Sequence, residues 1–436
     1  MIEVVRYTGD LEQPLLARIR ARQLGADSEI HAAVAGIVDD VRRRGDAALL
    51  DYTEQFDGVR PRPDALRFDM RTAYEMAATV PPELAGALRG AIVNVRAFHE
   101  RQVERSWELS GPDGIVLGQR ITPVDRAGLY IPGGRAAYPS SVIMNAIPAQ
   151  VAGVRRIVAV TPPGALVENP AISFVLVELG IDEVYAIGGA QAIAALAFGT
   201  ETVPKVDKIV GPGNTYVALA KKLVFGAVGI DSIAGPSEIV VLADRTANPR
   251  WVAADMLSQA EHDVDASAIC ITPDAVFAER LAAEVAEQCM LLDRRGIASA
   301  SLARYGAIFV VDDLDAGCDL VNHLAPEHLE IVAEDEDRIA ALIRNAGAIF
   351  FGPYSAEVVG DYYAGPNHVL PTGGTSRFMS PLGVYDFVKR TSIIRYTRER
   401  LLATGPSIAA IANAEGLGAH ARAVTIRLED ESSPDE

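Results

Sequence analysis

Cysteine is scarce in this chain. Cys270, Cys289 and Cys318 are the only three cysteines among 436 residues, and no two of them have the C-x-x-C spacing. Their odd number and their spacing argue against a disulfide framework and favour a reducing compartment, so we expect a cytoplasmic protein. Cys270 lies in the apolar run S-A-I-C-I-T, where a free cysteine is more typical of a packed core than of a nucleophile.

Long apolar runs and an excess of basic residues are also missing. The chain has no run of about 18 apolar residues, the length typical of a membrane span. Its first residues, M-I-E-V-V-R-Y-T-G-D, lack the basic-then-apolar order of a signal peptide. The 40 Lys and Arg residues against 58 Asp and Glu residues give a net charge of −18. This balance argues against nucleic acids and anionic membrane surfaces as general partners.

What the chain does have is a regular alternation of apolar segments. Residues 1–26 form a short lead-in with one helical piece, and residues 27–110 carry apolar residues mostly at helical spacing. From about Gly114 onward, strand-like and helical runs alternate, and Pro or Gly stands at nearly every junction. Such alternation predicts parallel sheets that are covered by helices on both faces.

The alternation occurs in two blocks, so we expect an α/β protein with two doubly wound, incomplete Rossmann-like modules and small N- and C-terminal helical segments. The first module covers residues 130–236. The second covers residues 237–381, and we expect residues 27–129 to pack on it as part of the same domain. Residues 382–436 are too few for a core of their own, so this segment should dock elsewhere, for example on a partner subunit.

Three glycine-rich loops follow strands of the first module. They are Tyr130–Arg135, Gly188–Gln191 and Gly211–Asn214, and each precedes a predicted helix. None has the complete G-x-G-x-x-G pattern, but backbone N–H groups at helix N-termini can hold phosphates without it. Although tight turns need glycine in any case, three such loops in one module predict a phosphate-bearing ligand.

A glutamate and a histidine stand side by side in the stretch N-H-L-A-P-E-H-L-E. Glu327 and His328 follow Pro326 and precede the apolar run Leu329–Ala333. At a loop-to-strand junction these groups are suited to acid/base work, because histidine titrates near neutral pH and burial raises the pKa of a glutamate. The alternative is a structural role, in which Glu327 caps or forms a salt bridge and His328 is a surface residue.

The seven histidines differ in their surroundings. His31 and His99 lie on amphipathic helices, where a structural role is expected, and the other five lie in or near junctions and in the C-terminal segment. Open α/β sheets place their sites at such junctions. Gln259 and His262 are three residues apart at a helix end and therefore share a face, although a histidine there can also cap the helix.

Two further segments place a carboxylate near a histidine. Asp361 and His368 lie in a Gly/Pro/Asn loop, and Glu415 and His420 surround two glycines near a helix end. Each segment can also be read as a turn or a helix cap. An amide oxygen, two imidazoles and a carboxylate together would suit zinc, or manganese or cobalt, better than magnesium or calcium. The spacing alone does not bring these segments together.

With these motifs in hand, the chain resembles the histidinol dehydrogenase family. The resemblance extends over most of the chain in one uninterrupted order, and G-P-S-E and A-P-E-H-L-E are its most specific motifs. The other matching stretches are Y-I-P-G-G, G-G-A-Q-A-I-A-A-L-A-F-G-T, V-D-K-I-V-G-P-G-N, L-S-Q-A-E-H, D-Y-x-A-G-P-N-H-x-L-P-T and E-G-L-x-A-H.

The resemblance implies an NAD-dependent homodimer with one zinc ion per subunit. It implies oxidation of L-histidinol through L-histidinal to L-histidine, with two NAD⁺ and one water, in the last two steps of histidine biosynthesis. It also implies that residues 130–236 bind NAD and that the domain of residues 27–129 and 237–381 carries the metal and catalytic groups. The C-terminal segment would reach into the site of the partner subunit.

The same resemblance implies roles for individual residues. Glu327 and His328 would be the acid/base pair. The implied zinc ligands are Gln259, His262, Asp361 and His420; the implied substrate contacts are Ser237, Gln259, His262, His328, Asp361, Glu415 and His420; and the implied NAD contacts are Tyr130, Gln191 and Asn214.

The residues present also indicate how the second oxidation proceeds. Because no cysteine lies in a site motif, we expect the aldehyde to react through a hydrate rather than through a thioester. We expect Glu327 to activate the water and His328 to take the hydroxyl protons. A related zinc- and NAD-dependent dehydrogenase of another small polyol or amino alcohol is the alternative, and a metal- or nucleotide-binding protein without turnover is a second one.

Overall fold

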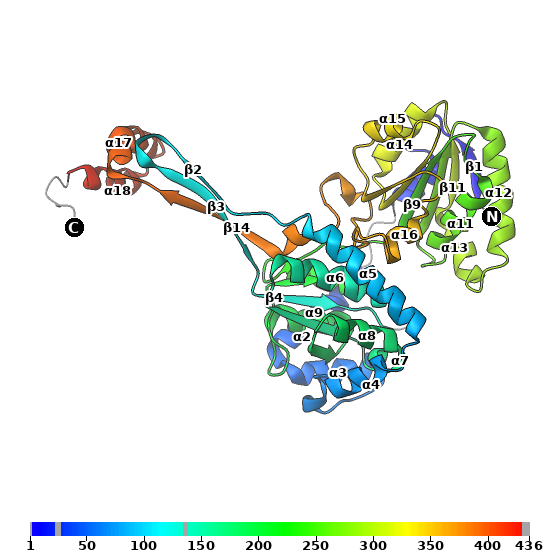
Figure 1. The fold of residues 1–436 in the computed structure, drawn as a ribbon, viewed down its shortest axis with the longest axis horizontal. Coiled ribbons are helices and arrows are strands. Elements are labelled where there is room, and N and C mark those ends of the chain that lie inside the picture. Colours follow the sequence, from blue (N-terminus) through cyan, green and yellow to red (C-terminus); the bar gives the residue numbers. More distant parts are fainter. Residues whose placement is uncertain (1, 22–27, 134–137, 430–436) are drawn as a thin grey trace. The chain divides into compact units, whose positions relative to one another are not determined.

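The computed structural model describes residues 2–21, 28–133 and 138–429, which form two compact units. The larger unit contains the described residues up to Gln102 and those from Asp125 to Phe387. The smaller unit contains Val103–Val124 and the described residues from Val388 onward. Figure 1 labels many of the helices and strands of each unit.

The first module of the larger unit is built around a five-stranded parallel sheet. Its strand order is β6-β5-β4-β7-β8, and every neighbouring pair is parallel. The strands are β4 (Arg126–Tyr130), β5 (Arg156–Thr161), β6 (Glu183–Ala186), β7 (Lys208–Val210) and β8 (Gly229–Ile230). Between them along the chain come α6 (Pro139–Ala152), α7 (Ala165–Glu168), α8 (Pro170–Glu178), α9 (Gly189–Phe198) and α10 (Thr215–Val224). The predicted βα alternation is therefore confirmed in this module.

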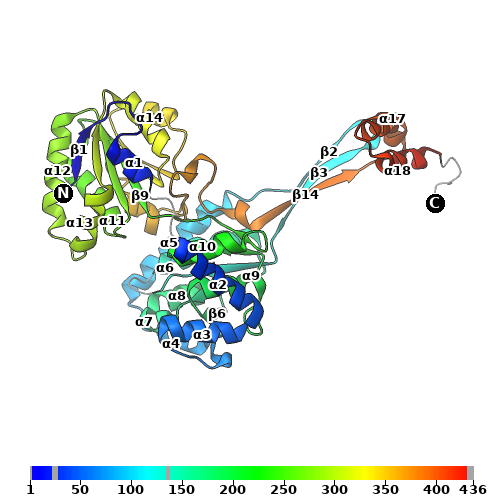
Figure 2. The same cartoon turned by 180° about the vertical axis from the view of Figure 1, so that it is seen from behind.

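The early helices pack on the first module, not on the second, so that part of the predicted packing is wrong. They are α2 (Ser28–Arg44), α3 (Asp46–Asp57), α4 (Met70–Ala77) and α5 (Pro82–Glu100). The helices α2 and α3 contact α9, whereas α4 and α5 contact α8 (Figure 2). Val41 and Leu49 share one buried cluster with Ile193 and Leu196. The apolar faces were predictable from helical spacing, but nothing in that spacing specifies which apolar surface they cover.

The second module contains a six-stranded parallel sheet with the order β1-β11-β10-β9-β12-β13. Its strands are β1 (Glu3–Arg6), β9 (Glu238–Ala243), β10 (Ser267–Thr272), β11 (Ala307–Val310), β12 (His328–Val332) and β13 (Ala348–Phe351). Its helices are α1 (Pro14–Arg20), α11 (Pro249–Ala260), α12 (Ala275–Cys289), α13 (Arg295–Tyr305), α14 (Leu314–Leu324), α15 (Glu336–Leu342) and α16 (Glu357–Tyr362).

The N-terminal lead-in is more than a helical segment. Strand β1 adds to the edge of the six-stranded sheet beside β11, and Leu16 of α1 is buried in the same core as Phe309. Cys270 lies in the middle of β10 and is completely buried, and this burial raises the pKa of its thiol. The structure confirms that Cys270 is a core residue.

The smaller unit pairs two segments that are far apart in the sequence. Strand β3 (Val116–Pro123) lies between β2 (Trp107–Ser110) and β14 (Val388–Arg395), and both pairings are antiparallel. The helices α17 (Arg398–Ala414) and α18 (Gly418–Glu429) contact each other through Ala409, Ala412 and Ala421. Residues 103–124 therefore belong with the C-terminal segment, not with the early helices as the sequence predicted. Strand β3 pairs with β14, which is far away in the sequence, so no local sequence pattern predicted this pairing.

None of the helices in the described parts of the chain combines the length and apolarity that a bilayer crossing requires.

Candidate active site

A cavity of about 350 Å³ in the larger unit brings together most of the polar residues that the sequence singled out. It is lined from the first module by Tyr130, Gly211 and Asn214, and from the second by several of the predicted site residues. Those from the second module are Ser237, Gln259, His262, Glu327, His328, Asp361 and His368.

The two modules contribute opposite edges of their sheets to this cavity. Tyr130 is the last residue of β4 and Gly211 follows β7, so the first module contributes the carboxyl edge of its strands. The neighbouring strands β4 and β7 are where the strand order changes direction, the usual ligand crevice of an open α/β sheet. His328, by contrast, is the first residue of β12, and Ser237 directly precedes β9. The second module thus contributes the amino edge of its strands.

The backbone of Glu238 holds both members of the Glu327–His328 pair. The Glu238 N–H donates to Oε2 of Glu327 at 2.9 Å, and the Glu238 carbonyl oxygen lies 3.0 Å from Nδ1 of His328. A carbonyl oxygen can only accept, so Nδ1 must carry a proton. In the neutral imidazole, Nε2 is then the basic nitrogen, and it has no hydrogen-bond partner among the described residues.

The turn before the Glu327–His328 pair contains a residue with a left-handed backbone conformation. Ala325 directly follows α14 and has a φ of 51°, and Pro326 and Glu327 lead directly into β12. His328 lies opposite Ile239 of β9 and Ala348 of β13 in the sheet. The pair is therefore fixed by a helix end on one side and by two neighbouring strands on the other.

Three carboxylates surround His328. Its Nε2 lies 3.6 Å from Oε1 of Glu357 and 3.7 Å from Oδ1 of Asp361, and its Nδ1 lies 3.7 Å from Oε2 of Glu327. Burial alone would lower the pKa of His328, but Glu327, Asp361 and Glu357 outweigh it and raise the pKa to about 10.

The three carboxyl groups around His328 differ widely in pKa. Burial raises the pKa of Glu327 to about 8 and that of Glu357 to about 7. Burial would also raise the pKa of Asp361, but the imidazoles of His328 and His368 outweigh it and lower the pKa to about 2. Asp361 is thus a permanent anion, whereas Glu327 can exchange a proton near neutral pH.

Glu357 was missed in the sequence, although a signal for it exists. It stands four residues before Asp361 on α16, so the two side chains share a helix face. Glu357 is 1% exposed, and its Oε2 accepts a hydrogen bond from the Ser258 hydroxyl at 3.1 Å. A buried acidic residue at this spacing from Asp361 adds a third carboxylate to the surroundings of His328.

The cavity fits a divalent cation by the chemistry of its donors. His328, Glu357 and Asp361 each offer one donor atom, and these atoms lie within 4.8 Å of one another. Oε1 of Gln259 is buried, and it has no hydrogen-bond partner among the described residues. Burial lowers the pKa of His262, which keeps its imidazole neutral and able to ligate at neutral pH. Gln259, His262 and Asp361, the predicted metal ligands of this unit, all line the cavity.

The predicted NAD contacts are only partly brought together. Tyr130 lines the cavity with its hydroxyl accepting from the Gly189 N–H at 3.1 Å, and burial raises the pKa of Tyr130 to about 12. Asn214 also lines the cavity, and its Oδ1 caps α10 by accepting from the Val217 N–H at 3.1 Å. Gln191 is buried in the first turn of α9, outside the lining of the cavity. Arg135 of the first glycine-rich loop lies outside the described residues.

The two remaining site predictions lie in the smaller unit. Glu415 directly follows α17 and His420 lies in α18, and both side chains are exposed there. Their membership of the site stays a prediction.

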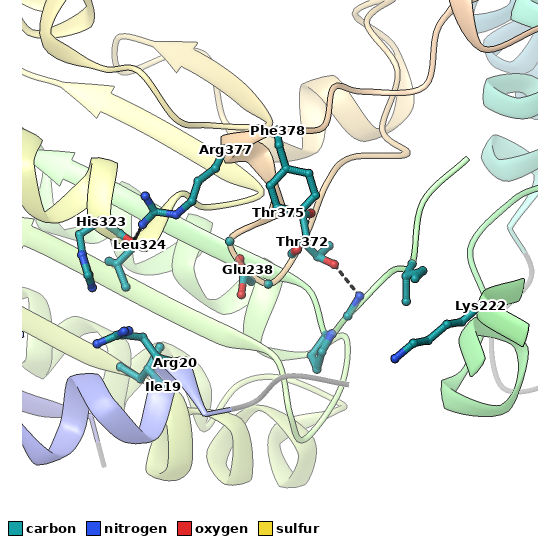
Figure 3. Close-up of a pocket in the computed structure, with 15 residues that line it drawn as sticks. Ile19, Arg20, Lys222, Glu238, His323, Leu324, Thr372, Thr375, Arg377 and Phe378 are labelled. Carbon is teal, nitrogen blue, oxygen red and sulfur yellow. Dashed lines mark hydrogen bonds between the residues drawn. The ribbon is translucent and has the colours of Figure 1, made fainter. Parts of the chain in front are cut away.

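A second cavity of about 530 Å³ borders the first and shares Gly235 and Thr372 with it. Figure 3 shows its charged side chains, Arg20, Arg377 and Lys222, together with the side chain of Glu238. It contains neither the Glu327–His328 pair nor a cluster of buried carboxylates. We therefore place the chemistry in the smaller cavity.

Comparisons with known proteins identify the family of the chain. The family model described as histidinol dehydrogenase matches residues 20–428. The chain is 57% identical to the histidinol dehydrogenase of Halalkalibacterium halodurans and 55% identical to that of Geobacillus kaustophilus. Each comparison extends over 402 residues, which are 92% of this chain and 94% of the relative. A crystal structure of histidinol dehydrogenase from Elizabethkingia anophelis aligns over 99% of both chains, with a TM-score of 0.91 and 36% identity.

Replacement of Asp361 tests the cation site directly. We expect Asp361→Asn to weaken zinc binding by about 10- to 100-fold or more, because it removes the permanent anion of the site. Equilibrium dialysis of the metal-depleted protein against zinc measures the change. Asp337→Asn, which removes an exposed carboxylate on α15, is the matched control. Unchanged zinc affinity in folded Asp361→Asn protein would contradict the assignment.

Proposed function

The chain belongs to the histidinol dehydrogenase family, and we propose that its 350 Å³ cavity oxidises L-histidinol through L-histidinal to L-histidine, with two NAD⁺ and one water. The observation that carries the proposal is the fixed Glu327–His328 pair. The Glu238 carbonyl oxygen engages Nδ1 of His328, which leaves Nε2 for the substrate. The buried cysteines support action in a reducing cytoplasm.

Zinc and NAD⁺ complete the site in this proposal. Gln259, His262 and Asp361, with His420 of the C-terminal segment, would hold the zinc ion. A zinc ion there would supply positive charge that orients the amine and imidazole nitrogens of the substrate and lowers the pKa of His328 toward neutral. Tyr130, Gln191 and Asn214 hold NAD⁺, which accepts a hydride in each oxidation. Ser237 contacts the substrate from the start of β9.

His328 is the base of the first oxidation. Its Nε2 removes the proton of the substrate hydroxyl, and the carbon–oxygen double bond of histidinal forms as a hydride leaves the same carbon. Glu357 and Asp361, at 3.6 and 3.7 Å from Nε2, stabilise the imidazolium that results.

Glu327 is the base of the hydration step. It removes a proton from water as the water oxygen bonds to the aldehyde carbon, while the imidazolium of His328 returns its proton to the carbonyl oxygen, and the product is a hydrate. His328 then takes a proton from one hydroxyl of the hydrate while the second hydride leaves, which gives the carboxylic acid of histidine. The elevated pKa of Glu327, about 8, makes it a stronger base than an exposed glutamate.

The smaller unit supplies the rest of the site in a homodimer. We assign Glu415 and His420 to substrate binding in the cavity of the partner subunit. Exposed apolar side chains on the smaller unit, among them Leu109, Ile394 and Ile411, support its burial against another surface.

Replacement of Glu327 separates the two oxidations. Glu327→Gln keeps an oxygen that can accept from the Glu238 N–H but cannot take a proton from water. We expect it to leave the histidinol-to-histidinal step largely intact and to slow oxidation of supplied L-histidinal by about 10²- to 10⁴-fold. Single-turnover NADH formation from each substrate measures the two steps. Exposed Glu334→Gln is the control, and equal slowing of both steps would refute the assigned roles.

The pH dependence of histidinal oxidation reports the pKa of Glu327. Since the active form is the carboxylate and its pKa is raised from the usual 4.5 to about 8, the active fraction grows as pH increases through 8. We expect kcat/KM for L-histidinal to increase about tenfold per pH unit below this value and then to level off. The pH profile of Glu327→Gln should lack this increase in kcat/KM and keep any pH dependence that comes from His328. A wild-type profile that is flat from pH 6 to 9 would contradict Glu327 as the base.

Mixed dimers test the sharing of the site. His328→Gln damages the larger unit and His420→Asn damages the smaller one, so each variant alone should be inactive. If sites form across subunits, random mixing of the two chains restores roughly a quarter of wild-type activity, because half of the dimers carry one intact site. If each chain completes its own site, co-expressed variants stay inactive, and that result would overturn the shared site.

A further inference from the structure

We propose that the buried ion pair of Lys221 and Asp231 is a positioning device for the dinucleotide, which fixes the loop from Gly211 to Asn214 in the shape that NAD⁺ binding requires. The inference rests on the proposed function and adds to it two residues that act through the backbone rather than by touching the reacting atoms.

The pair is buried and borders the catalytic cavity. Lys221 lies on α10 and Asp231 directly follows β8, and their side chains are only 2% and 4% exposed. Nζ of Lys221 and Oδ1 of Asp231 form the ion pair. Both residues contribute to the lining of the cavity that also contains Tyr130 and Asn214.

Both charged groups are also bonded to the backbone of one residue. Nζ of Lys221 donates to the Gly211 carbonyl oxygen at 3.0 Å, and Oδ2 of Asp231 accepts from the Gly211 N–H at 2.8 Å. Gly211 follows the last residue of β7, where its N–H and C=O would otherwise lack a partner from the sheet. The ion pair thus satisfies both backbone polar groups of Gly211.

Gly211 also packs against the other side of the crevice. Its φ is +121°, a conformation that favours glycine, and a Cβ atom at this position would lie 2.2 Å from the Tyr130 carbonyl oxygen. The backbone of Gly211 therefore touches the backbone of Tyr130, which carries another proposed NAD contact. A shift of Gly211 would disturb both strand ends of the crevice.

The far end of the loop is fixed by Asn214. Its Oδ1 accepts from the Val217 N–H at 3.1 Å and so ties the loop to the first turn of α10. The loop is thus held at Gly211 by the ion pair and at Asn214 by the helix cap. A loop fixed at both ends presents its N–H groups in one arrangement, which reduces the ordering cost of binding a phosphate-bearing ligand.

Stability alone does not account for a charged pair here. Burying two charges costs desolvation, and apolar side chains of similar volume are often equally good for the fold. Apolar side chains, however, can bond neither the N–H nor the C=O of Gly211. The geometry therefore points to loop placement as the role of the pair.

Two variants separate a role in positioning the loop from a role in stabilising the fold. Lys221→Met leaves the Asp231 carboxylate buried without its partner, so it should lower both thermal stability and NAD⁺ affinity. Lys221→Met combined with Asp231→Leu removes both charges, and we expect it to regain the thermal stability lost in the single variant. The double variant should nevertheless keep a Kd and a KM for NAD⁺ at least about tenfold above wild type, while KM for L-histidinol changes less than about twofold.

The measurements are NAD⁺ binding by calorimetry, steady-state kinetics with each substrate varied, and thermal unfolding, all on the zinc-loaded full chain. Lys222→Met is the matched control, because it removes the neighbouring exposed lysine of the same helix. Wild-type affinity for NAD⁺ in the double variant would overturn the proposal, as would an equal increase in KM for both substrates. A wild-type protein that forms no NADH from L-histidinol would instead refute the proposed function.

Discussion

The site depends on the backbone of Glu238, the first residue of β9. Its N–H binds the carboxylate of Glu327 and its carbonyl oxygen binds the imidazole of His328. Because Glu238 is paired with Ser267 of β10 and the next residue, Ile239, is paired with His328, the two side chains cannot change position without disturbing the sheet. The tautomer of His328, and with it the nitrogen that faces the substrate, follows from this one contact.

Several charged side chains lie close to the imidazole of His328. Glu327, Glu357 and Asp361 are all buried or nearly so beside one imidazole. Burial disfavours the charged form of a carboxyl group and is the main reason for the raised pKa values of Glu327 and Glu357; repulsion from the Asp361 carboxylate adds to it. A bound cation and a substrate amine would both relieve this repulsion. The site is therefore arranged for positively charged ligands rather than for a neutral alcohol alone.

Much of the fold could be predicted from the sequence, because parallel strands buried on both faces leave short apolar runs between Pro and Gly. The loop-to-strand junction predicted at Glu327–His328 is confirmed, because β12 begins at His328. Strands β1, β2, β3 and β8 were not predicted. All four residues of β2 are exposed, and β8 has only two residues. The Glu327–His328 motif was recognisable, and the spacing of Glu357 and Asp361 on α16 was a local signal that was missed. The contacts of Glu357 with His328 and of Lys221 with the Gly211 backbone form only in the fold, so local patterns do not encode them.

The central claim is that one fixed Glu–His pair carries a primary alcohol through two oxidations. The most direct measurement is the amount of NADH formed per L-histidinol when the zinc-loaded protein receives limiting L-histidinol and excess NAD⁺. The account predicts two NADH for each L-histidinol, with L-histidine as the product. One NADH with accumulation of L-histidinal, or no NADH at all, would contradict it.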